Sequence, residues 1–276
     1  MTGTYSRGRI ALWGRDGALL DVLGKGPGEG PGEFDYVTDL IQSSDSAFVV
    51  FGSSALVHEY SRTEGFVRSF RLPLHGSVSS GAGYGNQVIL AVSVGDGWQA
   101  YRVDGDKVQA MGVPLVSGDA WPMLAAAEDV GLWSAGTDRY VLRRHDWPGG
   151  TMVDSLVLSR DWISGDRGSE VLIYRVHADG RGLIWAAAQV PNPDAPRRPP
   201  EELDAPVVLH EEGQAGTIGY HNFVIEALTP DGRLVASVRF DSLDDAPHPV
   251  AGNLWYRPSP DRLSIVILEA VLAERR

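Results

Sequence analysis

Turns built on glycine recur at a nearly regular spacing along this chain, and that spacing constrains its fold more than any other feature. The turns lie at Asp16-Gly17, Glu64-Gly65, Asp104-Gly105, Gly149-Gly150 and Asp231-Gly232. Successive glycines are 48, 40 and 45 residues apart as far as Gly150, and the final gap of 82 residues contains a long insert. A β-rich stretch flanks each turn on both sides. A strand-based period of roughly 40 to 50 residues is typical of the blades of a β-propeller.

The clearest module runs from Thr38 to His75 and contains four short apolar runs joined by tight polar turns, which predicts one four-stranded antiparallel blade. Its strands are expected at Thr38–Gln42, Ala47–Phe51, Ala55–Tyr60 and Phe66–Leu72. The same order recurs three times, with strands expected at Ser77–Gly81, Val88–Val92, Trp98–Val103 and Lys107–Val113; at Pro122–Ala126, Val130–Ser134, Tyr140–Arg144 and Thr151–Leu158; and at Val171–Val176, Leu183–Val190, His221–Leu228 and Arg233–Phe240.

Neither end of the chain supplies a whole blade by itself. The N-terminal region offers strands at Arg9–Trp13 and Ala18–Leu23, and the C-terminal region offers strands at Val250–Gly252, Asn253–Arg257 and Leu263–Leu272. An open ring would leave unpaired sheet edges, so we expect strands from both termini to close it. We predict an all-β propeller of five or six four-stranded antiparallel blades, in which Ala18–Leu23 pairs beside the C-terminal strands.

Composition fits one such domain over residues 1–276 and removes several classes of partner. The chain is 43% hydrophobic, has a net charge of −12 and contains no cysteine. Because an acidic surface without a basic stripe is a poor counterion for phosphate, we expect neither nucleic acid nor anionic membrane as a partner. The missing cysteines remove disulfides, thiolate metal sites and cysteine nucleophiles. No apolar run reaches the roughly 18 residues of a membrane span, and we expect no signal peptide in this chain.

One segment interrupts the repeat. Residues 191–216 contain six prolines and many charges, including Glu201, Glu202 and Asp204. Proline removes backbone donors from a β-ladder, so we predict a loop inserted between two strands of the fourth module. Loops of this length are usually functional or disordered, and the sequence leaves a surface extension, a lid and a partner-binding loop as alternatives.

The most distinctive string is the glycine-proline run from Gly24 to Phe34, GKGPGEGPGEF. It is no phosphate-binding loop, because Gly26 follows Lys25 where such a loop needs Ser or Thr, and no helix pattern follows. Alternating glycine and proline favour an irregular connector with positive φ at several glycines. We expect it to cross from the outer strand of one blade to the inner strand of the next.

A strand ending in Leu23-Gly24, followed by Gly30-Pro31-Gly32-Glu33-Phe34 and then a blade, resembles the NHL-like six-bladed β-propellers common among bacterial exported proteins. The segment Ala227–Ser237 resembles the repeated hairpin of the same family. The resemblance implies six blades, whereas the sequence offers four complete modules and one assembled from the termini. It also implies an extracytoplasmic location and a binding or scaffold role more often than fixed catalytic chemistry.

Propeller ligands bind at the mouth of the central channel, near the inner strands and the loops that lead into them. The polar residues expected there are Asp39, Arg175, His177, His221, Asn222, Asp245 and His248. Carboxylate and amide oxygens are ligands for Ca²⁺, and lactonase-like propellers hold a metal with such groups from different blades. A candidate calcium set is Asp39, Asn222 and Asp245; ordinary solvated or turn-forming roles are the alternative.

Other chemistry finds little support in the sequence. The seven histidines form no His-x-x-x-His or His-x-His pair, and no Gly-x-Ser-x-Gly elbow is present. The tryptophans recur with the modules, so we expect Trp121, Trp133, Trp185 and Trp255 to fill the core, with a sugar-binding face as the alternative.

These observations predict a non-catalytic scaffold for an unidentified protein or small molecule, with no required cofactor. A Ca²⁺-dependent lactonase or esterase is the alternative, and a purely structural protein that makes its contacts through the insert is a third hypothesis.

Overall fold

The structure is a computed structural model, and it describes the greater part of the chain. The described residues are 2–6, 8–13, 16, 18–28, 30–34, 37, 39–42, 47–51, 56–61, 63–72, 76–85, 87–104, 107–117, 121–127, 130–137, 140–146, 149, 151–158, 160, 171–192, 221–241, 245–251, 253–259 and 265–271.

The described residues contain strands and no helix. The strands are β1 (Thr2–Ser6), β2 (Arg9–Trp13), β3 (Leu19–Leu23), β4 (Asp39–Gln42), β5 (Ala47–Phe51), β6 (Leu56–Ser61), β7 (Gly65–Arg71), β8 (Val78–Tyr84), β9 (Gln87–Val94), β10 (Gly97–Asp104), β11 (Lys107–Ser117), β12 (Pro122–Ala127), β13 (Gly131–Gly136), β14 (Val141–His145), β15 (Met152–Val157), β16 (Leu172–Ala178), β17 (Ile184–Pro191), β18 (His221–Leu228), β19 (Leu234–Phe240), β20 (His248–Ala251), β21 (Leu254–Pro258) and β22 (Ile265–Glu269). Across this part of the chain, no helix is long and apolar enough to cross a membrane.

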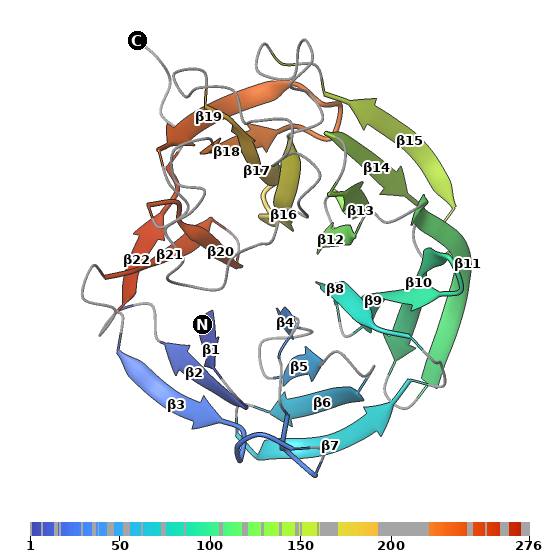
Figure 1. Cartoon of the computed structure of the whole chain (residues 1–276), viewed down its shortest axis with the longest axis vertical. Helices are drawn as coiled ribbons and strands as arrows, with labels where there is room; N and C mark the ends of the chain where they lie inside the picture. The colour runs from blue at the N-terminus through green and yellow to red at the C-terminus, as the bar shows by residue number, and fades with distance from the viewer. Residues whose placement is uncertain are drawn as a thin grey trace, which may run out of the picture.

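The strands form antiparallel sheets arranged around a ring, which confirms the predicted β-propeller (Figure 1). Four sheets have four strands each, in the orders β4-β5-β6-β7, β11-β10-β9-β8, β12-β13-β14-β15 and β16-β17-β18-β19. They correspond to the four complete modules expected from the sequence. Two three-stranded sheets, β1-β2-β3 and β20-β21-β22, contain the strands nearest the chain ends. In each four-stranded sheet the first strand along the chain borders the central channel, and the last lies at the rim.

The recurring glycine turns precede the last strand of a sheet, as predicted. They lie between β2 and β3, β6 and β7, β10 and β11, β14 and β15, and β18 and β19. Gly65 and Gly232 have φ values of 72° and 84°, a conformation that costs other residues steric strain. Gly17, Gly105 and Gly150 lie outside the described residues.

One expectation about closure is wrong. Ala18–Leu23 was predicted to pair beside the C-terminal strands, but β3 pairs with β2 in a sheet of its own. The reason is β1, Thr2–Ser6, which the sequence did not suggest as a strand and which gives the first sheet its own inner strand. Strands from both termini do meet, because β1 lies beside β20 (Figure 1). The ring is therefore closed by two adjacent sheets rather than by one shared ladder.

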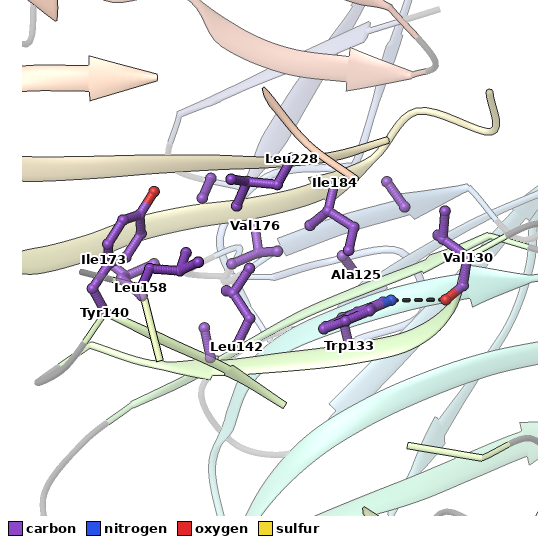
Figure 2. Packing of buried hydrophobic residues seen from close by; sticks show 13 residues of the cluster. Ala125, Val130, Trp133, Tyr140, Leu142, Leu158, Ile173, Val176, Ile184 and Leu228 are labelled. Atoms are coloured by element: carbon purple, nitrogen blue, oxygen red, sulfur yellow. Dashed lines mark hydrogen bonds between the residues drawn. The ribbon is translucent and has the colours of Figure 1, made fainter. Parts of the chain in front are cut away.

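The core lies between successive sheets. The largest cluster joins β12–β15 to β16–β19, and Figure 2 shows Trp133, Leu142, Val176 and Ile184 packed within it. The Trp133 indole is fully buried and donates a 2.7 Å hydrogen bond from Nε1 to the carbonyl oxygen of Val130. Middle strands such as β17 and β18 are buried at every position, and burial of apolar side chains between sheet faces is the main favourable term in such a fold.

The glycine-proline linker crosses from β3 to β4, as predicted. It folds back on itself, since Lys25 N donates to Gly32 O at 2.9 Å and Phe34 N donates to Gly26 O at 3.1 Å. Gly24, Gly26 and Gly32 all have positive φ. The fold-back buries the Phe34 ring between the first two sheets.

The proline-rich insert begins later than predicted. Pro191 is the last residue of β17 and is the register partner of His221, the first residue of β18. A proline is tolerated there because it stands at the end of the ladder, where the chain is leaving the sheet. Residues 193–220 lie outside the described part of the chain. The β17–β18 ladder is complete up to the insert on both sides.

Candidate functional site

The inner strands all begin at the same end of the ring. Each four-stranded sheet is antiparallel throughout, so its last strand ends where its first strand began, and the chain enters the next inner strand from that end. The starts of β4, β8, β12, β16 and β20 therefore surround one end of the channel, which we call the channel mouth (Figure 1). Three of the predicted site residues lie on these strands: Asp39 and His248 are the first residues of β4 and β20, and Arg175 is the fourth residue of β16.

Asp39 opens β4 and is buried despite its charge. Its Oδ1 accepts a hydrogen bond from the backbone N–H of Leu40 at 2.9 Å, and its Oδ2 accepts one from Gly81 N on β8 at 3.2 Å. A Cβ at Gly81 would overlap the end of the Ile41 side chain, which would have to shift. Glycine thus lets β8 approach β4 closely enough for its backbone to reach the carboxylate.

Arg175 reaches Asp39 from the opposite side of the channel. Its Nη2 lies 2.7 Å from Asp39 Oδ1, although β16 and β4 face each other across the ring (Figure 1). A β-bulge turns the Arg175 side chain toward the channel, because the register shifts between Ile173 and Arg175 and leaves Tyr174 as an extra residue. Ile173 and Val176 consequently share one core cluster, and Arg175 points away from it.

Further hydrogen bonds continue around the ring from Asp39. On β8, the hydroxyls of Ser79 and Ser80 both donate to the carbonyl oxygen of Pro122 on β12, at 3.0 and 2.9 Å. A bulge at this point of β8 aims two consecutive serines at one acceptor.

Thr137 carries the chain of contacts onward to β16. Trp121 N donates to Thr137 Oγ1 and Thr137 N donates to Trp121 O, both at 3.1 Å. Ile173 N on β16 donates to Thr137 O at 3.3 Å. With the Arg175–Asp39 pair, these bonds complete a circuit that joins all four four-stranded sheets. We call this circuit the channel belt; its members are Asp39, Ser79, Ser80, Gly81, Trp121, Pro122, Thr137, Ile173 and Arg175.

His248 opens β20 beside the belt. Its ring stacks on Tyr256 with centroids 5.1 Å apart, and it meets Tyr174 at 6.1 Å. Burial lowers the pKa of His248 to about 4, and the positive charge of Arg175 lowers it further in the same direction. The imidazole is therefore neutral at pH 7 and extends the belt toward the last sheet through ring contacts. Tyr174 and Tyr256 were not anticipated, because the bulge that places Tyr174 has no signature in the sequence.

The other predicted channel residues lie elsewhere. His177 is near the far end of β16 and meets the Trp255 ring edge-on at 6.4 Å. His221 and Asn222 are buried at the start of β18, the third strand from the channel in its sheet. Asp245 lies on an exposed turn before β20.

The structure therefore gives Asp39 a guanidinium and two backbone N–H groups as partners, and it places Asn222 and Asp245 on other segments. Within the described ranges, no three His, Asp or Glu side chains cluster as metal ligands. The calcium set of Asp39, Asn222 and Asp245 stays a prediction.

Three of the four predicted core tryptophans are confirmed. Trp133, Trp185 and Trp255 are buried, and Trp185 meets Trp255 edge-on at 5.4 Å between the last two sheets. Trp121 is different, because 53% of it is exposed. It precedes the first residue of β12, so its position at the channel mouth places the indole over the end of the core rather than inside it.

The sequence did not single out Glu226, a buried glutamate that joins two sheets. Glu226 on β18 accepts a 2.7 Å hydrogen bond from the Tyr140 hydroxyl, and Arg160 Nε lies 2.9 and 3.0 Å from its two carboxylate oxygens. Burial raises the pKa of Tyr140, and the Glu226 charge raises it further. These contacts bind the sheet β12–β15 to the sheet β16–β19 away from the channel. A lone Glu in an apolar strand pattern was the only signal available.

Comparison with known proteins supports the fold alone. No family model matches the chain, and no curated protein matches its sequence. A DUF4221 family member from Bacteroides vulgatus superposes with a TM-score of 0.61 at 11% identity, covering 95% of this chain and 86% of that one. A catalytically inactive virginiamycin B lyase from Staphylococcus aureus gives 0.54 at 13% identity, covering 95% and 88%. BBS1N in complex with ARL6DN gives 0.50 at 11%, covering 96% and 73%. What this chain shares with these proteins is its fold, an all-β propeller.

Proposed function

We propose that this protein is a non-catalytic binding scaffold whose recognition surface is the channel-mouth face. The observation that carries the proposal is the channel belt. Its carboxylate, guanidinium, hydroxyl and backbone groups bond to one another from sheet to sheet. A closed circuit of this kind fixes the spacing of four sheets, and a surface that is already ordered loses little conformational entropy when a partner binds.

The polar groups at the channel mouth also differ from a reactive arrangement. A general base needs a lone pair directed at substrate, and a catalytic metal needs several oxygens free to converge on it. Asp39 instead directs its oxygens at Arg175, Leu40 N and Gly81 N. Solved neighbours of the same fold include both a lyase and a propeller bound to a protein, so the fold alone does not choose between the two functions.

The test separates a scaffold from the alternative Ca²⁺-dependent lactonase or esterase. We would titrate Ca²⁺ into the purified protein, follow thermal unfolding, and assay hydrolysis of simple lactones and aryl esters. We expect no rise in melting temperature at millimolar Ca²⁺ and no hydrolysis above buffer. A cation that binds only the folded state must raise the melting temperature. At a hundredfold excess over its Kd, it adds about 2.7 kcal/mol to the free energy of unfolding. Calcium-dependent hydrolysis that disappears in Asp39→Asn would overturn the scaffold proposal.

We further propose that the ring belongs with the NHL-like six-bladed propellers. Supporting it are the linker Gly30–Phe34, which crosses between sheets as a blade connector would, and the sheet orders of the described strands. An extracytoplasmic location rests on that resemblance alone. Fractionation of cells that express the natural protein would test it, and recovery with the cytoplasm would contradict it.

A further inference from the structure

Trp121 combines exposure with rigid support, which sets it apart from the other exposed apolar residues. Its indole is 53% exposed, whereas most other large exposed apolar side chains, such as Val157 and Leu20, belong to rim strands. Its backbone N–H and C=O both bond to Thr137. The next residue, Pro122, accepts hydrogen bonds from two serines of the neighbouring sheet. The channel belt therefore holds Trp121 from both sides.

The indole is also paired with a second tryptophan. The ring of Trp98 lies 5.7 Å from that of Trp121 at an interplanar angle of 47°, and Trp98 is only 8% exposed. Trp98 belongs to the core between β8–β11 and β12–β15, where it packs with residues such as Ile89 and Leu132. A buried ring thus supports an exposed ring, and the pair presents a fixed aromatic surface at the channel mouth. We call it the tryptophan pair.

One described acidic residue neighbours the pair along the chain. Asp96 is exposed on the β9–β10 turn, two residues before Trp98. The whole chain has a net charge of −12. An electron-rich indole face on an acidic protein attracts a cation rather than an anion, and Arg is the cation that stacks best on Trp.

We propose that the tryptophan pair is the docking point for an arginine-bearing basic segment of a partner protein. One guanidinium lies over the exposed face of Trp121, and flanking basic groups meet Asp96 and the acidic surface. This inference rests on the proposed scaffold function and names the chemistry of its partner. Tryptophan and arginine are both enriched among the residues that carry most of the binding energy in protein interfaces. The rigid support means that little side-chain order has to be acquired on binding.

The experiment uses the full chain and a blocked nonapeptide with three arginines spaced by glycines. Binding is followed by calorimetry and by tryptophan fluorescence at 50 mM salt. We expect Trp121→Ala to weaken binding by about 5- to 30-fold, the range of a partly desolvated cation–π contact. Trp121→Phe keeps a ring face and should lose less than about 3-fold. Met152→Ala removes a side chain of similar exposure from the rim strand β15 and is the matched control, with unchanged affinity expected.

Two further peptides fix the chemistry. Replacement of the three arginines by citrulline keeps the planar shape but removes the charge and turns one NH2 donor into a carbonyl acceptor, and it should abolish binding. Replacement by glutamate should abolish binding as well. Equal affinity of Trp121→Ala and the wild type would overturn the proposal, because the peptide would then bind by charge alone. Equal binding of the citrulline peptide would overturn it as well. Absent peptide binding without any lactone turnover removes this inference and leaves the scaffold function standing, whereas turnover removes the scaffold function whatever the peptide does.

Discussion

Asp39 and Arg175 show how one contact connects opposite sides of the ring. The carboxylate is buried, while 39% of the Arg175 side chain is exposed. Substitution of Asp39 therefore leaves a charge that water can reach, whereas substitution of Arg175 leaves a buried charge. Asp39→Asn keeps the size of the side chain but removes the ion pair. We expect a loss of about 1–3 kcal/mol in the free energy of unfolding, less than for a fully buried pair because Arg175 can turn to water.

Denaturant unfolding measures this loss, and a double-mutant cycle with Arg175→Met isolates the pair. Arg175→Met leaves the buried carboxylate without its cation, so it should cost more than Asp39→Asn. A coupling free energy near zero would show that the 2.7 Å contact adds nothing to stability.

Two histidines with lowered pKa values predict how stability changes with pH. His58 is fully buried against Phe34 and Phe66, and neither ring nitrogen has a hydrogen-bond partner among the described residues. Burial lowers the pKa of His58, and the pKa of His248 is lowered to about 4. A folded pKa below the unfolded value of about 6.5 means that the unfolded state binds the proton first, so stability falls as the pH drops below about 6.5.

The slope for each such histidine approaches about 1.4 kcal/mol per pH unit, and for His248 it flattens again near pH 4. His58→Phe should remove the contribution of His58 to the pH dependence of the free energy of unfolding. At pH 8 the free energy of unfolding should stay within about 1–2 kcal/mol of wild type. Denaturant titrations at pH 8, 6 and 5 measure the difference. Parallel pH profiles for wild type and His58→Phe would contradict the prediction.

For single residues, the sequence predicted which polar side chains lie near the channel but not which groups they bond to. Asp39 and Arg175 were both expected near the channel, and they do meet. Their pairing depends on the bulge at Tyr174, which is a backbone irregularity that alternation cannot reveal. Trp121 was assigned to the core by its module position, and only its place beyond the end of β12 exposes it.

Among the elements, the glycine-proline linker is the most constrained. Gly8 precedes β2 with φ of 76°, and a Cβ there would overlap backbone atoms of Gly26 and Phe34. Gly65 has nearly the same φ, 72°, but a Cβ there would meet nothing within 4 Å. Gly8 and Gly65 therefore have similar backbone strain and differ only in the room available for a Cβ.

Gly65→Ala should therefore cost about 1–2 kcal/mol of stability, the strain alone. Gly8→Ala should cost about 1–3 kcal/mol more, because the linker must move away from β2 to make room. Thermal unfolding of the two variants side by side provides the comparison. If both variants melt at the same temperature, the close approach of the linker to Gly8 is not a structural requirement.

Strand positions were the most predictable elements. Ala47–Phe51 and His221–Leu228 agree with β5 and β18 at both ends, since apolar runs bounded by turn residues mark a strand on both sides. β1 was missed because Thr2–Ser6 is mostly polar and lacks that pattern. Propensity alone cannot find a strand whose place is determined by its neighbour in the sheet.

For the whole molecule, the insert tests how much of the chain the ring needs. Pro191 and His221 are already register partners, so the β17–β18 ladder does not require residues 193–220. In a variant where Asn192 is followed by a single glycine and then by His221, an Asn-Gly hairpin turn replaces the insert. We expect an intact ring, stabilised by about 1–2 kcal/mol through the shorter loop.

Circular dichroism and cooperative thermal unfolding measure that outcome. Loss of cooperative unfolding in the shortened variant would show that the insert contributes to the ring itself. Retained folding leaves the insert free to act as a binding element, which the arginine peptide assay can then compare in the two proteins.

The manner of closure was beyond the sequence. Four complete modules were predictable because each repeats the same strand and turn order. The joining of the ends depended on whether a weak N-terminal strand existed, and no local pattern decided this. The sequence offered one sheet assembled from both termini, whereas the structure has two three-stranded sheets there, because β1 pairs with β2.

The channel belt has a consequence for how the ring assembles. Its closed circuit passes only through β4–β19, and core clusters of the described residues lie between every successive pair of sheets except the last and the first. The four middle sheets can thus lock together before the two ends of the chain meet. We therefore expect the contact of β1 with β20 to form last during folding and to open first on local unfolding.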